Sequence, residues 1–169
     1  VMRDPDGKGW IMYFTARVPG RTEPNAGGAI GFATSPDLNT WTLQKPIYDG
    51  AAFGQLEVPQ VFKHGNHWFM TYCTSSHQWA ESYRKDNPQT PVTGSSYLMA
   101  QSHLGPWHAA KPFLDGREPC NRYAGKIIAK DGKLHIMGFH NIDQNGRFIG
   151  KVSDPSPVGI KADGTLRLE

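Results

Sequence analysis

The hydrophobic and polar positions of this chain form a pattern that occurs three times. Each copy begins with a glycine-containing turn and continues into an aromatic-rich apolar run, at residues 10–14, 68–72 and 134–139. A second short run follows in step with the first, at residues 29–35, 96–102 and 147–153. Because the runs are short and bounded by turn residues, they predict β-strands. A repeat of this length indicates stacked units, each of them a small sheet.

The second run ends at a serine that opens a further turn. In the first two copies, Ser35 and Ser102 lead through this turn to Trp41 and Trp107, whereas the third copy turns at residues 153–155 without a tryptophan. Each copy therefore predicts an up-and-down antiparallel sheet of about four strands, which is the form of a propeller blade. The predicted fold is all-β, a partial β-propeller of about three four-stranded antiparallel blades. We expect a single domain over residues 1–169, with blades at approximately residues 1–50, 51–116 and 117–169.

Composition agrees with this fold and narrows the possible partners. Nineteen glycines and thirteen prolines interrupt the chain, and no window shows sustained helical periodicity, so the polar segment 75–94 is predicted to be a surface loop. The net charge of +3 comes from interspersed charges without a basic run, which disfavours nucleic acid. No apolar stretch approaches the roughly 18 residues of a membrane span. Cys73 and Cys120 are expected to be unpaired thiols.

The alternation of turns assigns each segment to one of two faces. The turns at Gly7, Gly65 and Gly132 share one face, here called the bottom face, so the first residues of the inner strands lie on the opposite, top face. Glu57 lies at such a position in the second copy. Crowding between blades would partly desolvate its carboxyl group and raise its pKa, which suits a proton donor. A glutamate that caps a turn or meets an arginine is an equally good interpretation of the same position.

Three segments resemble a known family. Residues 10–17, 30–41 and 56–62 are similar to the five-bladed propeller glycosidases, the superfamily of invertases, levansucrases and arabinanases (glycoside hydrolase families 32, 68 and 43). The resemblance spans almost the whole chain, and residues 30–41 are its most specific part. It implies the C-terminal part of such a propeller, acting on a furanoside or on an arabinose- or xylose-containing glycoside. It also favours a secreted or periplasmic location.

The resemblance implies three catalytic carboxylates on inner strands: a nucleophile or base, an aspartate of an Arg-Asp-Pro motif, and a glutamate as general acid. Glu57 matches the glutamate. Asp4 stands in an Arg-Asp-Pro string, but aligning the glycine turns places it at the bottom end of its strand, and its surroundings have the composition of a tight turn. We therefore predict that Asp4 belongs to a hairpin turn. The chain then supplies a proton donor without the second carboxylate, which hydrolysis needs about 5 to 9.5 Å away.

Further candidates lie on the top face. The predicted substrate contacts are Arg17, His77, Trp79, Arg122 and Tyr123. Trp79 could stack on a sugar ring or pin its loop to the blade, and both alternatives stay open. No histidine spacing matches a metal site, so neither a metal nor another cofactor is expected.

Three blades do not close a ring, and their flanks would expose apolar surface and strand edges. We expect that N-terminal blades outside this sequence or a second copy of the chain covers them. The predicted function is a glycoside hydrolase-like propeller fragment that binds carbohydrate and is incomplete or inactive alone. The alternative is a non-catalytic propeller fragment that binds carbohydrate or another protein.

Overall fold

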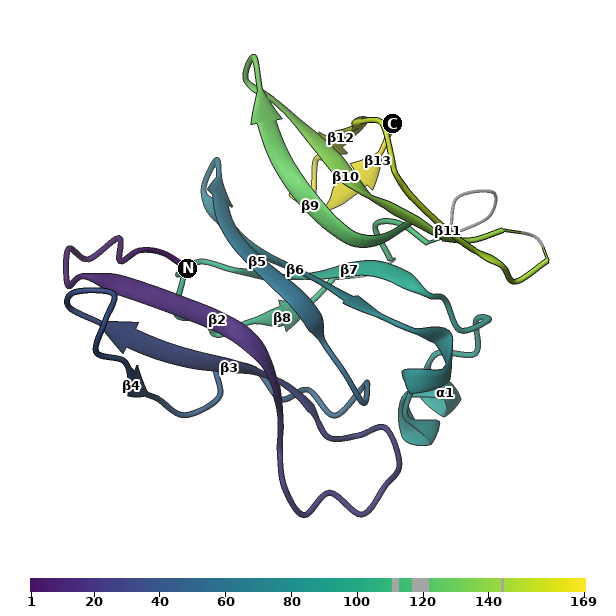
Figure 1. Cartoon of the computed structure of the whole chain (residues 1–169), viewed down its shortest axis with the longest axis horizontal. Coiled ribbons are helices and arrows are strands. Elements are labelled where there is room, and N and C mark those ends of the chain that lie inside the picture. The colour runs from purple at the N-terminus through teal and green to yellow at the C-terminus, as the bar shows by residue number, and fades with distance from the viewer. Residues whose placement is uncertain (111–112, 117–121, 144) are drawn as a thin grey trace.

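The computed structural model describes residues 1–110, 113–116, 122–143 and 145–169, and contains three antiparallel sheets. The sheets follow one another across the molecule in chain order (Figure 1). The first sheet has the order β1-β2-β3-β4 and comprises β1 (Met2–Arg3), β2 (Trp10–Arg17), β3 (Gly28–Ser35) and β4 (Thr42–Leu43). The second has the order β5-β6-β7-β8 and comprises β5 (Glu57–His64), β6 (His67–Thr74), β7 (Gly94–Ala100) and β8 (His108–Ala109).

The third sheet departs from the expected strand plan. It comprises β9 (Arg122–Lys130), β10 (Lys133–Ile142), β11 (Phe148–Val152), β12 (Ser156–Ile160) and β13 (Leu166–Leu168). β9 pairs with one edge of β10, and β11 and β12 share the other edge. The turn predicted at residues 153–155 is wrong: the chain continues along β10 there, and the Ser153 amide donates to the Gly138 carbonyl at 2.8 Å. β11 and β12 therefore act as one interrupted third strand, and β13 is the fourth.

With this correction the all-β fold of three sheets, each shaped like a four-stranded blade, is confirmed. The blade boundaries themselves stay predictions. Trp107 is buried and its β8 follows directly, as the pattern predicts, while β4 follows Trp41 in the same way.

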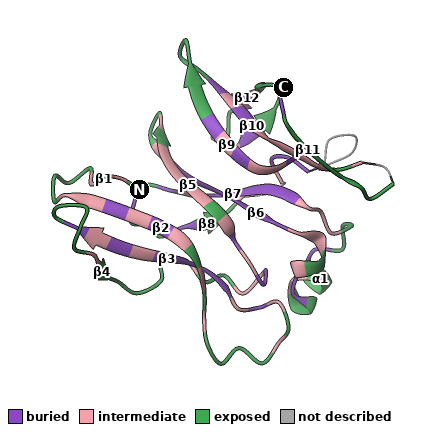
Figure 2. Cartoon of the chain, in the orientation of Figure 1, coloured by how far each residue is buried: buried purple, intermediate pink, exposed green. Residues whose placement is uncertain are grey.

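Two hydrophobic cores hold the sheets together, one at each junction between neighbours. The core between the first and second sheets includes Ile11, Ile30, Met70, Tyr72 and Leu98. The core between the second and third sheets includes Phe69, Tyr97, Ile127, Ile136 and Leu166. Since β6 and β7 face both cores, nearly all of their residues are buried (Figure 2). The middle sheet is thus the platform on which the other two pack.

The hairpin turns explain the glycine pattern. Gly7, Gly65 and Gly132 have φ angles of +77°, +56° and +73°, which glycine adopts without steric cost. Asp4 lies in the first of these turns, where its amide donates to the Gly9 carbonyl at 2.9 Å. Its carboxylate accepts the Asp6 amide, also at 2.9 Å. The predicted hairpin role of Asp4 is confirmed.

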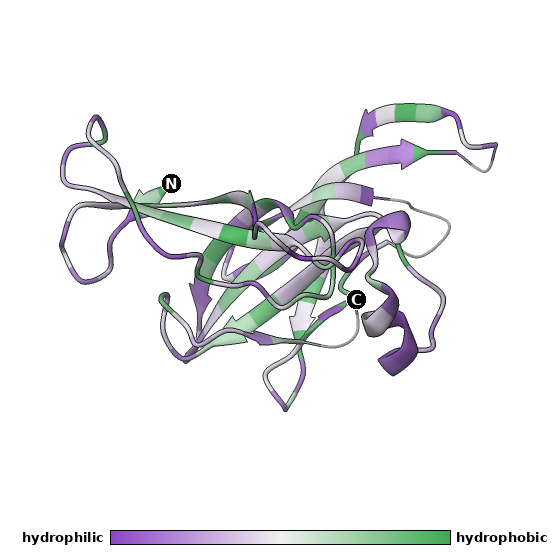
Figure 3. Ribbon diagram, turned by 90° about the horizontal axis from the view of Figure 1, so that it is seen from below, coloured by the Kyte–Doolittle hydropathy of each residue, from purple (hydrophilic) through white to green (hydrophobic). Residues whose placement is uncertain are grey.

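The segment after β6 is more ordered than predicted. It contains a 3-10 turn, η1 (Ser76–Gln78), and a short helix, α1 (Glu81–Asp86). The prediction of a plain loop is wrong here because six mostly hydrophilic residues (Figure 3) are too few to show a helical period. An ion pair from Lys85 to Glu81 at 2.9 Å supports the helix.

No helix in the described ranges is both long and apolar enough to cross a bilayer. Cys73 is a buried free thiol, and Cys120 lies outside the described residues.

Candidate functional site

The inner strands of the second and third sheets begin with the same backbone irregularity. In β5 the pairing with β6 shifts between Glu57 and Gln60, and Val58 has a φ of +47°. In β9 the pairing with β10 shifts just after Tyr123, and Ala124 has a φ of +53°. Such bulges re-aim side chains, and a left-handed non-glycine residue persists only where its surroundings hold it. Glu57 and Tyr123 therefore occupy equivalent positions, each immediately before a left-handed residue.

The two bulges bring these side chains together. The Tyr123 hydroxyl donates a hydrogen bond to Glu57 Oε2 at 2.5 Å, a distance typical of a strong bond to a carboxylate. Burial first, and then the hydrogen bond to Glu57, raise the pKa of Tyr123 well above its ordinary value. The phenol therefore stays a donor at neutral pH. Glu57 is half-buried, and its Oε1 has no hydrogen bond to a described residue.

Further contacts tie the β5 bulge to the third sheet. Lys126 Nζ donates to the carbonyl of Val58 at 2.5 Å and lies 3.4 Å from that of Pro59. The side chain of Gln60 makes two hydrogen bonds to the backbone of Ile127. Its Nε2 donates to the Ile127 carbonyl at 2.8 Å, and its Oε1 accepts from the Ile127 backbone amide at 2.7 Å. Burial lowers the pKa of Lys126. Sequence reasoning missed Gln60 and Lys126, because nothing local marks residues that meet only when two sheets pack.

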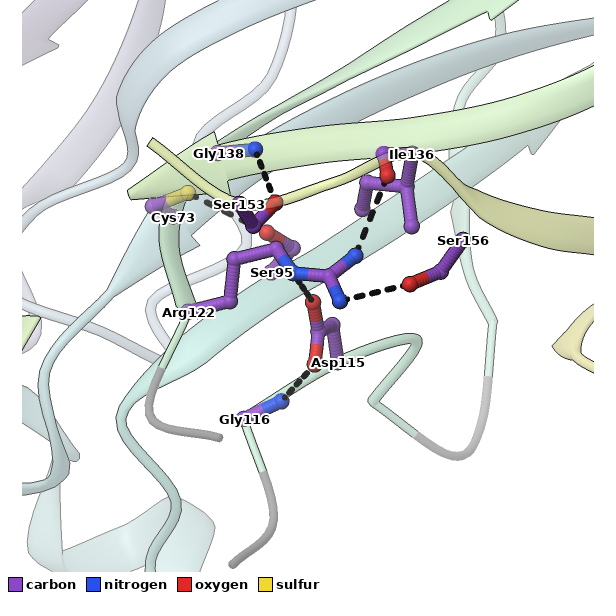
Figure 4. A network of polar contacts seen from close by, with 9 residues as sticks. All are labelled: Cys73, Ser95, Asp115, Gly116, Arg122, Ile136, Gly138, Ser153 and Ser156. Carbon is purple, nitrogen blue, oxygen red and sulfur yellow. Dashed lines mark hydrogen bonds and ion pairs between the residues drawn. The ribbon is translucent and has the colours of Figure 1, made fainter. Parts of the chain in front are cut away.

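Arg122 takes a different direction from Tyr123. Its side chain is buried among three partners of the third sheet and the preceding segment (Figure 4). Nη1 donates to the Ile136 carbonyl at 3.1 Å and Nη2 to Ser156 Oγ at 2.7 Å. Nε forms an ion pair with Asp115 Oδ2 at 3.1 Å, without the alignment of a full hydrogen bond. Arg122 thus has the position of an internal brace, with its donors directed away from a ligand on the top face.

Asp115 completes this brace. Burial raises the pKa of its carboxyl group, while the neighbouring Arg122 charge opposes that rise. Its Oδ1 accepts the Gly116 amide at 2.8 Å. The pair therefore links the segment after the second sheet to the start of the third.

Trp79 is enclosed by other aromatic rings. Its side chain is 1% exposed, and its Nε1 donates to the Val92 carbonyl at 3.2 Å. The rings of Phe53, Tyr83 and Phe113 pack around it at centroid distances of 5.5, 5.3 and 5.5 Å. Stacking on a sugar needs an accessible ring face, so this geometry favours the other alternative, in which Trp79 pins its segment to the second sheet.

Arg17 and His77 are exposed near the top face. Arg17 ends β2 and lines a hollow of about 210 Å³ formed mainly by residues 17–27. The carbonyl of His77 accepts the Asn25 side-chain amide at 2.9 Å, which joins that segment to η1. Both side chains are available to a ligand, although neither makes a described contact with Glu57.

The other carboxylates serve local purposes. Asp37 and Asp163 accept backbone amides of their own turns. Glu81 pairs with Lys85, and Asp49 pairs with Arg21 at 3.4 Å. Within the described part of the chain, none of these carboxylates has a recorded contact with Glu57.

Known proteins resemble this chain in structure but not in sequence. No protein-family model matches the chain, and no curated protein matches it. Solved structures do match. An inulosucrase from Halalkalicoccus jeotgali bound to kestose has a TM-score of 0.82 and 19% identity, over 98% of this chain and 48% of the inulosucrase. A levansucrase from Gluconacetobacter diazotrophicus has a TM-score of 0.74 and 14% identity, over 99% of this chain and 43% of its own.

A mutant β-fructofuranosidase from Microbacterium saccharophilum K-1 shows the same likeness, with a TM-score of 0.77 and 13% identity over 99% of this chain and 41% of its own. The chain thus spans less than half the length of these proteins. Such identities establish the fold alone. The expected resemblance to the propellers of levansucrases and fructofuranosidases is therefore confirmed in the fold: this chain has the architecture of part of such a propeller.

Proposed function

We propose that this chain supplies the general acid of a glycoside-cleaving site, and that the acid is Glu57. The observation that carries the proposal is the short hydrogen bond from Tyr123 to a half-buried carboxylate at the start of an inner strand. The structural neighbours include an inulosucrase bound to kestose and a β-fructofuranosidase. We therefore propose a β-fructofuranoside as the substrate class, within the wider group of furanosides and pentosides.

In this mechanism the protonated Glu57 donates its proton to the glycosidic oxygen as the bond to the sugar breaks. The Tyr123 hydroxyl then stabilises the carboxylate that forms, because a phenol with a raised pKa remains a hydrogen-bond donor. The carboxylate next takes a proton from the incoming water or acceptor sugar. Hydrolysis also needs a second carboxylate about 5 to 9.5 Å from the acid. The proposal assigns this chain only the acid half of the reaction.

Replacement of Glu57 by Gln tests the proposal. In an assembly that also supplies the second carboxylate, we expect the variant to keep its fold and to lose about 10²- to 10⁴-fold in the rate of fructose release from sucrose or kestose, the usual contribution of a positioned acid. Glu81→Gln is the matched control, since this exposed carboxylate on α1 pairs with Lys85. Equal and measurable rates for wild type and Glu57→Gln in that assembly would exclude Glu57 as the acid.

The rival function is a non-catalytic module that binds carbohydrate or another protein, and the observation that favours it is the hollow lined by the exposed Arg17. In that case wild type releases no fructose even when the second carboxylate is supplied, and Glu57→Gln binds kestose as tightly as wild type in calorimetry. Alanine variants of the exposed Arg17 and His77 would then weaken binding.

The expected protein partner also stays a proposal. The third sheet leaves β11 exposed (Figure 2), with Phe148 73% and Val152 65% accessible. Exposed apolar side chains on a strand edge suit association with a second copy or with further blades. Light scattering of the purified chain would measure whether it self-associates.

A further inference from the structure

A group of metal-ligating side chains lies on the bottom face, at the other end of the strands from Glu57. Asp4 and Asp6 come from the turn between β1 and β2, and His103 comes from the turn between β7 and β8. One potential ligand atom from each residue lies within 4.8 Å of the others. The group therefore bridges the first and second sheets.

The histidine is unusual in its surroundings. The His103 side chain is 7% exposed and that of Asp4 is 10% exposed. His103 Nε2 lies 3.5 Å from Asp4 Oδ1, longer than the 2.7–3.2 Å of a usual N–H···O bond, and no ring nitrogen of His103 makes a hydrogen bond to a described residue. The imidazole nitrogen thus faces the carboxylate beyond ordinary hydrogen-bond distance, at a separation that suits two ligands of one ion.

The position of His103 is well determined by its neighbours. Its carbonyl accepts the Tyr13 hydroxyl at 3.0 Å, and its ring packs against Trp68 with centroids 5.4 Å apart. These contacts direct the imidazole at the first sheet. They leave its metal-binding nitrogen facing Asp4.

The donor set suits zinc. Imidazole nitrogen and carboxylate oxygen bind Zn²⁺ at about 2.0–2.2 Å, and two ligands of a tetrahedral ion then stand about 3.4 Å apart. The separation of 3.5 Å between His103 Nε2 and Asp4 Oδ1 is close to that spacing. Asp6 is exposed, so its side chain can rotate toward the ion. We propose that Asp4, Asp6 and His103 bind a divalent transition metal, Zn²⁺ in first place, with water as the fourth ligand.

Such an ion would link the first and second sheets and stabilise their packing. Two of its ligands belong to the first sheet and one to the second, so the complete site exists only when the sheets are packed. A ligand that binds only the folded state stabilises it by mass action. This role is independent of the proposed catalysis, because Glu57 lies on the opposite face.

The test is a calorimetric titration of the chelator-treated full chain with ZnCl₂. We expect one ion per chain, and a melting temperature raised by about 5–10 °C at a hundredfold excess over Kd. Asp6→Asn and His103→Gln should weaken binding at least about tenfold, since each removes one of three protein ligands. Asp6 is exposed, so its variant remains informative even if His103→Gln does not fold.

His108→Gln is the matched control, because His108 is an exposed histidine of β8 outside the cluster. It should bind zinc as wild type does. The proposal is overturned if wild type binds no zinc, which would leave His103 and Asp4 as a plain ion pair. It is equally overturned if Asp6→Asn binds like wild type, because the ion would then sit elsewhere.

Discussion

The strands β5 and β9 begin with the same backbone bulge, but the side chains beside the bulge have different roles. Each has a bulge opened by a left-handed residue, Val58 in one and Ala124 in the other. At β5 the preceding side chain, Glu57, is half-buried and faces the neighbouring sheet. At β9, Tyr123 reaches across to Glu57, while Arg122 turns inward and is 6% exposed. Equivalent positions in a repeat thus share geometry, whereas the neighbours of each side chain decide its role.

The largest expected effect comes from replacing Arg122, the side chain that turns inward. Arg122→Met leaves the buried Asp115 carboxylate without its counter-charge, so we expect a loss of about 3–5 kcal/mol in unfolding free energy, measured by urea denaturation at neutral pH. Arg17→Met is the matched control, and it should change stability by no more than about 0.5 kcal/mol because Arg17 is exposed. Equal losses for both variants would contradict the assignment of Arg122 as a brace.

The stability of Arg122→Met should also depend on pH, because Arg122 affects the pKa of Asp115. Burial already raises the pKa of Asp115, and the Arg122 charge limits that rise. A raised pKa in the folded state favours folding at low pH, and this contribution is lost as pH rises through the folded pKa. Without Arg122 the rise is larger, so the deficit of Arg122→Met should shrink toward about pH 4. A deficit independent of pH would contradict this explanation.

The next effect concerns the side chain that points outward. Tyr123→Phe removes the hydrogen bond to the Glu57 carboxylate. We expect the free energy of unfolding to fall by at most about 1.5–3 kcal/mol, since Glu57 is only half-buried. The raised pKa of Tyr123 also means that the folded phenol keeps its proton where the unfolded one, with a pKa of 10.0, loses it.

Wild-type stability should therefore fall above about pH 10 more steeply than that of Tyr123→Phe, by the equivalent of one proton. Urea unfolding between about pH 8 and 11 measures both quantities. Identical slopes would show that neither burial nor Glu57 raises the pKa of Tyr123 in the folded protein.

The smallest effect tests the bulge itself. Val58→Gly removes a left-handed cost of about 1–2 kcal/mol and adds an entropic cost of about 0.5–1 kcal/mol, so a net gain of up to about 1.5 kcal/mol is expected. Ala124→Gly should gain less, because alanine lacks the branched side chain. Melting temperatures compare the two variants. If both were destabilised to the same degree, the left-handed conformations would carry no strain.

The correct sequence predictions rest on local chemistry. Glycine turns and short apolar runs predicted the hairpins, including the place of Asp4, and the top-face position of Glu57 followed from the alternation of turns. The wrong predictions involve tertiary contacts or elements too short to show a period. Residues 153–155 continue a strand because β10 offers its edge, and α1 has only six residues.

The sequence by itself determined the glycine hairpins, most of the strands and the order of the three sheets, because those depend on residues close together in the chain. Only the tertiary structure decided that Tyr123 meets Glu57, that Arg122 is a buried brace and that His103 faces Asp4. Each of these depends on sheet packing, which brings together side chains far apart in sequence and sets whether a polar group faces water, an opposite charge or an apolar wall.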